Sequence, residues 1–380
     1  MTAWEIKGWC PGALRPMQSG DGLVVRIRPP MGRLTPHQAQ AIAQAAATHG
    51  NGTLDLSARA NLQLRGVTEA SHPRLIEDLR AQGLIDPDIQ TESLRNLIVT
   101  PFHDAETEAL AATLTAALAG MPHLPGKFGF ALDPGPRPVL ATTSADIRIE
   151  RAQDGTLILR PDGHPLGQPV SDLAQDAIAL AEWFIASGGI SNGRGRMAAL
   201  IARGALPPNC TLSPRKPLPT PAPGLYPEGA LVALAFGQMR ADTLQALAAL
   251  GHEIRPTPWR MLFLVGATTL PAIPGLITDP TEPLLRITAC TGAPACPQGL
   301  QPTRPLARHL APHLPPNQTL HISGCAKGCA HPAPADLTLT GTPQGYDLIR
   351  NGTASDTPSL TALAPQAIQD HLKAPHAPHL

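Results

Sequence analysis

Leu23-Val-Val-Arg-Ile-Arg28 begins the part of this sequence with the clearest secondary-structure signal. The run is rich in apolar and β-branched residues and predicts a strand. Thr35 then precedes a proline and a helical repeat of apolar residues that ends at Gly50, and residues 53–67 predict one or two further strands. Residues 21–67 are therefore expected to form a strand, a helix and one or two more strands.

The same order returns later in the chain. Residues 230–236 predict a strand, residues 241–250 a helix that Gly251 ends, and residues 261–265 a closing strand. We interpret this recurrence as an internal duplication of a ferredoxin-like half unit. The alternative is a pair of unrelated strand-helix-strand segments.

The region between the two copies has its own α/β pattern, with strands near 97–100 and 139–149 and helices at 105–119, 172–187 and 195–203. Proline is concentrated at Pro207–Pro223, which predicts a linker. Six segments follow from these patterns: a first half unit (1–75), a first α/β domain (76–206), the linker (207–223), a second half unit (224–275), a cysteine-containing α/β domain (276–365) and a flexible tail (366–380).

Composition limits the class of protein. The chain has 380 residues, and its 29 Lys and Arg balance its 29 Asp and Glu, so no overall field favours nucleic acid or a membrane surface. Apolar residues make up 43%, which argues against disorder. Neither a secretory signal nor a membrane span is evident, so we expect a cytoplasmic protein.

Four of the six cysteines fall in two close pairs, Cys290-x5-Cys296 and Cys325-x3-Cys329. Each pair is joined by a short stretch of turn-forming residues, so four thiolates can converge. Four converging cysteine thiolates are the usual ligands of a [4Fe-4S] cluster. The spacing therefore predicts redox chemistry.

A zinc site, disulfides and coincidence are the alternatives to a cluster. A structural zinc site usually separates its paired cysteines by about two to four residues, which fits the first pair poorly. Disulfides need an oxidising compartment, and chance would have to place both pairs within a short segment. For Cys10 and Cys210 we expect buried free thiols.

A second feature is the alternating run Ser57-Ala-Arg-Ala-Asn-Leu-Gln-Leu-Arg-Gly66. Alternation with a period of two predicts a half-buried strand, with four polar side chains on one face. Arg binds carboxylates through two parallel hydrogen bonds, so this face suits a ligand with several carboxylates, although it could also be an ordinary solvated sheet face. The four polar residues are Arg59, Asn61, Gln63 and Arg65.

Two further basic loops are candidates for anion binding. Lys127 lies at the entry to a short apolar run, and Arg194 and Arg196 lie on a glycine-rich loop before a helix. The glycine spacing there does not match a dinucleotide fingerprint, because a helical segment and not a strand precedes it.

The cysteine motifs Thr288-Ala-Cys-Thr-Gly-Ala-Pro-Ala-Cys296 and Ser323-Gly-Cys-Ala-Lys-Gly-Cys329 resemble the [4Fe-4S] and sirohaem signature of sulfite and nitrite reductases. The resemblance covers nearly the whole chain and implies an α+β fold: duplicated ferredoxin-like half units plus two α/β domains of the sirohaem and cluster-binding type, related by a pseudo-twofold axis. Within this superfamily, the Cys10-Pro-Gly, 59–66, 124–130 and 325–332 segments are most similar to the precorrin-3B synthase family.

The chain departs from the assimilatory reductases at two positions. Gly129 stands where those enzymes carry the second Lys of a Lys-x-Lys pair, and Lys327 stands where they typically carry Asn. The resemblance therefore implies aerobic cobalamin biosynthesis: hydroxylation of precorrin-3A at C20 with dioxygen and closure of a γ-lactone. The alternatives are a sirohaem-dependent sulfite or nitrite reductase and a non-catalytic iron-sulfur electron carrier.

The resemblance also implies cofactors and residue roles. It predicts a [4Fe-4S] cluster and a mononuclear non-haem iron, or sirohaem if the chain is a sulfite or nitrite reductase, with NADH as a direct or indirect reductant and a separate reductase as partner. The cluster ligands would be Cys290, Cys296, Cys325 and Cys329, of which Cys329 would lie nearest the second metal. Arg59, Arg65, Lys127, Arg194 and Arg196 would meet carboxylates, and Asn61 and Gln63 would contact pyrrole substituents or iron. The iron ligands stay open, with His103, His123 and His331 as candidates by location only.

Overall fold

The first predicted strand-helix-strand unit is present in the computed structural model, which describes residues 11–373. Its elements are β2 (Gly22–Ile27), α1 (Pro36–His49), β3 (Thr53–Leu56) and β4 (Leu62–Val67). Thr35 begins α1 with a capping box: the Gln38 amide N–H donates to the Thr35 hydroxyl, and the Thr35 amide N–H donates to the Gln38 side chain.

The second unit repeats the first, with β11 (Gly229–Leu234), α7 (Ala241–Ala249), β13 (Ile254–Pro256) and β14 (Met261–Val265). The repeat extends to unusual backbone conformations. Met31 and Phe236 both take a positive φ inside a short 3-10 turn after the first strand. Ala60 and Arg260 both take a positive φ in the turn before the last strand. Shared strain at matching places supports duplication over two unrelated segments.

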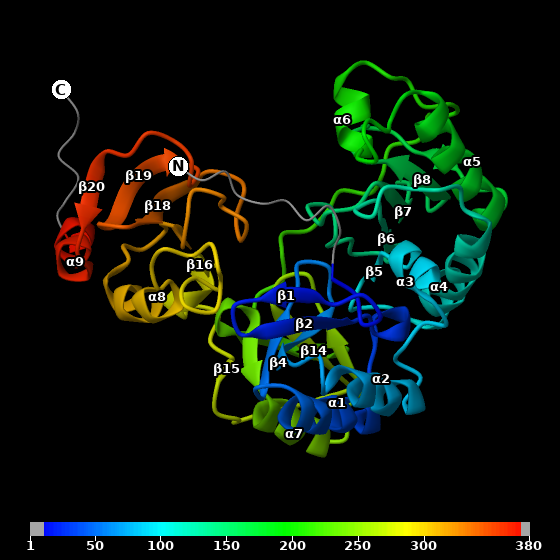
Figure 1. Ribbon diagram of the computed structural model, residues 1–380. Helices are drawn as coiled ribbons and strands as arrows, with labels where there is room; N and C mark the ends of the chain where they lie inside the picture. The colour runs from blue at the N-terminus through cyan, green and yellow to red at the C-terminus, as the bar shows by residue number, and fades with distance from the viewer. Residues whose placement is uncertain (1–10, 374–380) are drawn as a thin grey trace.

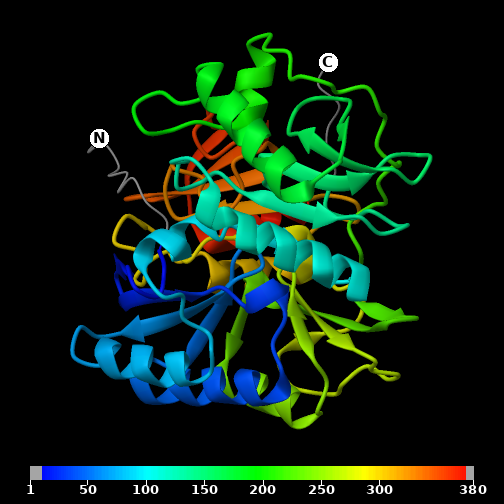
Figure 2. The ribbon, with the colours of Figure 1, turned by 90° about the vertical axis from the view of Figure 1, so that its right-hand side faces the viewer.

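The two half units form one body. Strand β12 (Gln238–Arg240) of the second unit pairs with β3 of the first, in the sheet order β1-β2-β4-β3-β12, where β1 is Met17–Ser19. The second sheet has the order β10-β11-β14-β13, with β15 paired to β11; β10 is Gly224–Tyr226 and β15 is Leu276–Ile277. Helices α1 and α7 lie side by side beneath these sheets (Figures 1 and 2).

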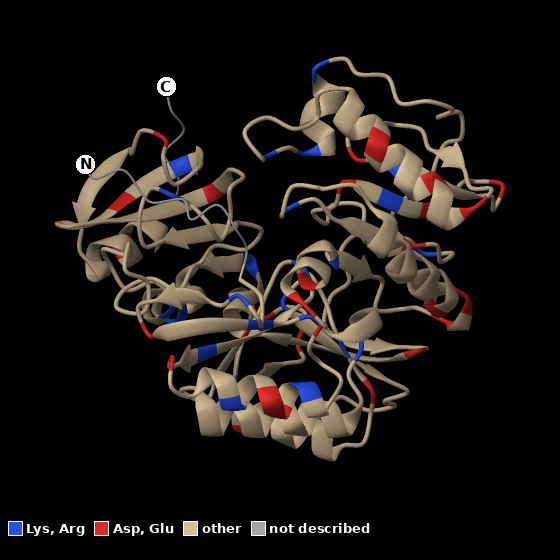
Figure 3. Ribbon diagram, turned by 45° about the vertical axis from the view of Figure 1, so that its right-hand side comes forward, with Lys and Arg blue, Asp and Glu red and all other residues tan. Residues whose placement is uncertain are grey.

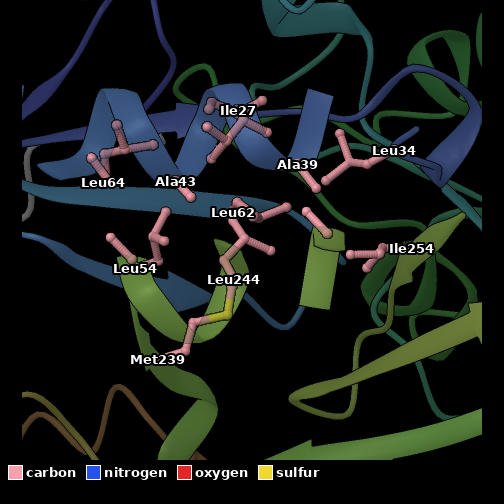
Figure 4. Close-up of a cluster of buried hydrophobic side chains, with 14 of the residues drawn as sticks. Ile27, Leu34, Ala39, Ala43, Leu54, Leu62, Leu64, Met239, Leu244 and Ile254 are labelled. Atoms are coloured by element: carbon pink, nitrogen blue, oxygen red, sulfur yellow. The ribbon is translucent and has the colours of Figure 1, made fainter. Parts of the chain in front are cut away.

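Both units also share one hydrophobic core. Figure 4 shows Leu54 and Leu62 of the first unit facing Met239 and Leu244 of the second. Leu34 and Ile254 are fully buried and exchange backbone hydrogen bonds across the boundary. Burial of apolar surface therefore ties the two copies together, because each supplies part of the core of the other.

Each half unit is followed by an α/β lobe with the same topology (Figure 1). In both lobes the first three strands are parallel and the last two join antiparallel. The first lobe contains β5 (Leu97–Val99), α4 (Ala105–Ala117), β6 (Phe130–Asp133), β7 (Ile147–Arg151), β8 (Leu157–Pro161), β9 (Gln168–Pro169), α5 (Leu173–Ala186) and α6 (Met197–Ala202). The second contains β16 (Ile287–Ala289), α8 (Arg304–Leu310), β17 (Leu320–Ser323), β18 (Ala335–Thr342), β19 (Gly345–Gly352), β20 (Leu360–Leu363) and α9 (Pro365–Lys373).

The whole chain is thus two copies of a half unit followed by an α/β lobe. Two short helices, α2 (His72–Ala81) and α3 (Ile89–Leu94), connect the first half unit to its lobe. This is the duplicated α+β fold predicted from the sequence. Within residues 11–373, no helix is both long enough and apolar enough to cross a bilayer.

Two local predictions need correction. The alternating run at 57–66 is not one strand, because residues 58–60 form a turn and β4 begins only at Leu62. Of the expected flexible tail, residues 366–373 are helical as part of α9, and Ile368 and Leu372 are buried in the core of the second lobe; residues 374–380 lie outside the described residues. The proline-rich segment 207–223 lies between α6 of the first lobe and β10 of the second half unit, and its Leu212 and Pro214 form β-bridges with the first lobe.

Candidate functional site

The two cysteine loops meet because they follow adjacent parallel strands. Cys290 comes directly after β16, and Cys325 comes two residues after the end of β17. The carboxyl ends of paired parallel strands lie at one edge of a sheet, where loops converge into ligand sites. The Gly324 amide N–H donates to the Cys290 Sγ at 3.2 Å, so the second loop already touches a sulfur of the first.

The thiols influence one another electrostatically. A hydrogen bond from Cys329, together with backbone amides, lowers the pKa of Cys290 to about 6. The pKa of Cys329 is raised by its contact with Cys290, by burial and by the nearby Cys296 and Cys325. All four thiols are thus close enough to interact, and Cys290 is the one poised to ionise.

Glycines allow the loops to pack closely. A Cβ at Gly292 would lie 2.6 Å from the Thr303 hydroxyl, and one at Gly299 would lie 2.6 Å from the Ala293 nitrogen. Gly292 also has a φ of +66°, within the left-handed region that favours glycine. Side chains at these positions would push the backbone away from the cysteines.

The cysteines open onto a cavity of about 730 Å³ between the two lobes and the β1–β2 hairpin. Loops from the first lobe supply its opposite wall, and Figure 3 shows Lys and Arg on the loops that face the cysteine lobe. The lining includes Met17, Gln18, Ser19, Lys127, Arg194, Arg196, Cys290, Cys296, Cys325, Lys327 and Cys329. The fold therefore brings Lys127, Arg194 and Arg196 to the four cysteines, from segments far apart in the sequence.

These basic residues differ in their partners. Arg196 donates from Nε to the fully buried Asp146 at 2.9 Å, and from Nη2 to the Ala145 carbonyl. Two of the three nitrogens of its guanidinium therefore already donate hydrogen bonds to the protein. Lys127 and Arg194 are exposed side chains on the cavity wall, and the described residues give neither of them an ion pair.

The residues of the 57–66 run do not line this cavity. Arg65 is buried and donates to both carboxylate oxygens of Asp21 and to the Ser19 hydroxyl. The Gln63 side chain accepts two hydrogen bonds from Arg26. Arg65 therefore contacts Ser19, which lines the cavity, but does not line the cavity itself. Gln63 is engaged by Arg26 of the neighbouring strand.

Arg59 and Asn61 also lie in two different places in the structure. The Arg59 Nη2 donates to the Lys127 carbonyl at 2.6 Å, so Arg59 holds the Lys127 loop from behind. Close packing explains why position 129 is a glycine. A Cβ there would lie 2.8 Å from the Asn96 carbonyl and 3.2 Å from the Arg59 Nη1. Asn61 instead lines a different cavity of about 470 Å³, beside Arg28 and Arg95.

Sequence reasoning missed the contribution of the β1–β2 hairpin. The Gly20 amide and the Ser19 hydroxyl both donate to the Ala295 carbonyl, at 3.0 Å each, inside the first cysteine loop. It also missed Arg26 on β2 and Arg28 just after that strand, two buried side chains on the sheet face of Gln63. The sequence signal for these two residues was the alternation of apolar and basic side chains at the end of the 23–28 segment.

The candidate iron-binding histidines do not come together. His103 is buried, its Nδ1 lies 2.8 Å from the Thr100 carbonyl, and burial lowers its pKa. His331 lies beside His321 at a ring separation of 5.6 Å, whereas His123 is exposed. Across residues 11–373, no group of three or more His, Cys, Asp or Glu side chains is arranged to hold a single metal ion.

The donor set does fit a four-iron cluster. Four thiols on two loops, one with a lowered pKa and a backbone N–H donated to its sulfur, match the ligands of such clusters and the hydrogen bonds that tune their sulfurs. Cys210 lies outside this set, and burial raises its pKa to about 11. Cys10 lies outside the described residues.

Comparisons with known proteins agree with the architecture. Residues 15–82 match the family model of the nitrite/sulfite reductase ferredoxin-like half domain. Precorrin-3B synthase of Sinorhizobium sp is 33% identical, covering 93% of this chain and 84% of that protein. Ferredoxin–nitrite reductase of Synechococcus elongatus is 25% identical over 86% of this chain and 77% of that protein. The structure of the Mycobacterium tuberculosis NirA protein has the same fold, with a TM-score of 0.62 and 18% identity over 84% of this chain and 71% of that one.

Proposed function

The chain belongs to the precorrin-3B synthase family, within the nitrite and sulfite reductase superfamily, and we propose that it converts precorrin-3A into precorrin-3B. It is accordingly an oxidoreductase of cobalamin biosynthesis. One oxygen atom of dioxygen becomes the hydroxyl at C20, and an acetate carboxylate of the substrate closes a γ-lactone. The other oxygen atom leaves as water, formed with a proton and the two electrons and proton of NADH, which acts directly or through a separate reductase.

The observation that carries this proposal is the composition of the cavity. Four cysteine thiols and four basic side chains line about 730 Å³, and no Asp or Glu of the described chain is among the lining residues. A cavity with these properties suits a redox centre beside a polyanionic substrate. Precorrins carry many peripheral carboxylates, whereas sulfite and nitrite are small.

In this proposal Cys290, Cys296, Cys325 and Cys329 hold a [4Fe-4S] cluster. When bound, the cluster would supply single electrons to the reaction. Lys127 and Arg194 bind carboxylates of the macrocycle from the opposite wall. Arg59 positions Lys127 through its carbonyl, and Asp146 holds Arg196 and the start of α6 in place.

The proposal is tested on anaerobically purified protein. Iron and acid-labile sulfide are measured together with optical and EPR spectra, and precorrin-3A, dioxygen and reductant are then added. We expect four irons and four sulfides per cluster and mass-spectrometric detection of precorrin-3B carrying one oxygen atom from ¹⁸O₂. Stoichiometric sirohaem with turnover of sulfite or nitrite would contradict the proposal, and a cluster without activity on precorrin-3A would indicate an electron carrier.

A further inference from the structure

The cavity beside the cysteines has an unbalanced charge. The whole chain is formally neutral, yet the described lining of the cavity contains Lys127, Arg194, Arg196 and Lys327 and no acidic residue. Of these four, Arg196 is neutralised by the buried Asp146. Among residues 11–373, no ion pair joins the other three cations to an acid. Basic side chains that face one another without counter-charges repel each other, so an anionic partner is expected to occupy the space between them.

Lys327 differs from the other two cations in its position. It lies between Cys325 and Cys329, on the loop that supplies two of the four thiols, and its side chain is exposed on the cavity wall. Lys127 and Arg194 lie on loops of the other lobe. The three cations therefore approach the same cavity from opposite sides, which suits one large ligand with carboxylates on more than one edge.

The loop around Lys327 is well fixed. The Ser323 hydroxyl donates to the Cys325 carbonyl at 2.7 Å. Gly328 has a φ of +60°, and a Cβ at this position would lie 3.3 Å from the Ala354 Cβ. An ordered backbone places the base of the Lys327 side chain, while its four-carbon stem lets the ammonium reach a ligand. A short amide side chain at this position would reach less far and carry no charge.

We propose that Lys327 binds a peripheral carboxylate of the tetrapyrrole, so that the cluster-binding loop is itself part of the substrate site. This inference rests on the proposed function and deepens it. Lys327 then acts as a specificity residue, because it favours a polycarboxylate macrocycle over a small oxyanion. It also couples the position of the macrocycle to the loop that holds Cys325 and Cys329.

The test compares three variants. Lys327→Gln removes the charge, Lys327→Arg keeps it, and Lys216→Gln removes an exposed lysine from the proline-rich segment outside the cavity lining. Dissociation constants for precorrin-3A and the EPR spectrum of the reduced cluster are measured anaerobically. KM and kcat are measured separately, in the presence of dioxygen and reductant. Uroporphyrin, a stable tetrapyrrole with eight carboxylates, serves as a second probe, and its methyl ester as the uncharged control.

We expect Lys327→Gln to weaken binding of precorrin-3A and uroporphyrin by roughly tenfold to a hundredfold, which is the usual effect of one hydrogen bond between charged groups. Lys327→Arg should restore most of the affinity, and Lys216→Gln should match the unmodified chain. Binding of the methyl ester should be weak for every variant. The EPR spectrum of the reduced cluster and the iron content should stay unchanged in every variant, because none of the substitutions removes a thiol.

Unchanged affinity for both ligands in Lys327→Gln overturns the inference. If the cluster spectrum shifts while the affinity stays unchanged, Lys327 serves the cluster alone. Failure of the proposed function has a different signature: the unmodified chain would bind uroporphyrin in a Lys327-dependent way and yet form no precorrin-3B.

Discussion

Arg65 and Lys127 both carry a positive charge near the cysteine cavity, but their surroundings assign them different tasks. Arg65 is buried against Asp21, and the Asp55 carboxylate lies 3.8 Å away. A buried guanidinium that is already paired with carboxylates offers little charge to a ligand. Lys127 is exposed on the cavity wall, and no ion pair among the described residues neutralises it. Binding of a polyanion is therefore expected to depend on Lys127 more than on Arg65.

A first prediction concerns a single cysteine. Cys325→Ala removes one of four thiols, so the protein should lose most of its iron and sulfide and all turnover, because three thiolates hold a cubane incompletely. Iron analysis and EPR measure the loss. Cys210→Ala is the matched control, since this half-buried thiol lies away from the cavity lining and should retain the full cluster. Full iron content in Cys325→Ala would contradict the ligand assignment.

At the scale of the element, the β1–β2 hairpin braces the first cysteine loop. Its turn residue Gly20 donates to the Ala295 carbonyl, and a Cβ at Gly20 would lie 2.8 Å from that same oxygen. Arg65 of β4 donates hydrogen bonds to Ser19 and Asp21 of the hairpin. The polar side of β4 is therefore connected to the first cysteine loop through the hairpin.

The second prediction tests this brace. Gly20→Ala should push the hairpin away from the cysteine loop, which we expect to cost about 1 to 3 kcal/mol of unfolding free energy and to speed the loss of iron to a chelator. Urea denaturation and chelation kinetics measure the two effects. Gly135→Ala is the control, because no atom lies within 4 Å of the Cβ that it would add. Equal chelation rates in both variants would refute the bracing role.

The end of β6 is a second element with a testable consequence. Burial raises the pKa of Asp133 to about 6, although its Oδ2 accepts hydrogen bonds from the Val139 and Leu140 amides. The folded state therefore holds the Asp133 proton more tightly than the unfolded state does. This contribution to stability is fully present below the unfolded pKa of about 3.9 and is lost as the pH rises through about 6.

The third prediction follows from this sign. Asp133→Asn cannot titrate, so its unfolding free energy relative to the unmodified protein should increase by about 1.4 kcal/mol between about pH 5 and about pH 7. Urea denaturation at both pH values gives the difference, and the subtraction removes the contributions of other groups. A difference that stays constant over this range would mean that Asp133 keeps an ordinary pKa.

At the scale of the molecule, the two repeats are interlocked. β12 completes the sheet of the first half unit, and Arg255 of the second unit donates to the Pro101 and His103 carbonyls of the first lobe. Arg304 at the start of α8 pairs with Asp55 on β3. Each lobe is thus tied to the half unit of the other repeat as well as to its own.

The fourth prediction is that neither repeat folds alone. A fragment of residues 1–206 lacks β12, α7 and Ile254, so the core shown in Figure 4 would be open to water. We expect the fragment to unfold without a cooperative transition, and to regain one when it is co-expressed with residues 207–380. Calorimetry measures both states. A cooperative, monomeric fragment would show that the shared core is dispensable.

The local elements could be predicted from the sequence because their signals are short in range. The capping box at Thr35, the apolar face of α1 and the turn residues around the cysteines all act within a few positions of one another. The cysteine spacing likewise indicated the donor set. The turn at residues 58–60 was missed because period-two alternation continues through it, although Ala60 takes a positive φ there.

Which basic residues face the cavity was decided only by the tertiary structure. Arg65 and Arg196 are neutralised by Asp21 and Asp146, partners that lie 44 and 50 positions away in the sequence. No local pattern encodes such a pairing, because it depends on how strands and loops meet in space. The sequence by itself determined the duplicated elements and the four thiols, through local periodicity and spacing. The folded chain determined that Lys127, Arg194 and Lys327 line the cavity with no ion pair among the described residues, because Asp146 pairs only with Arg196.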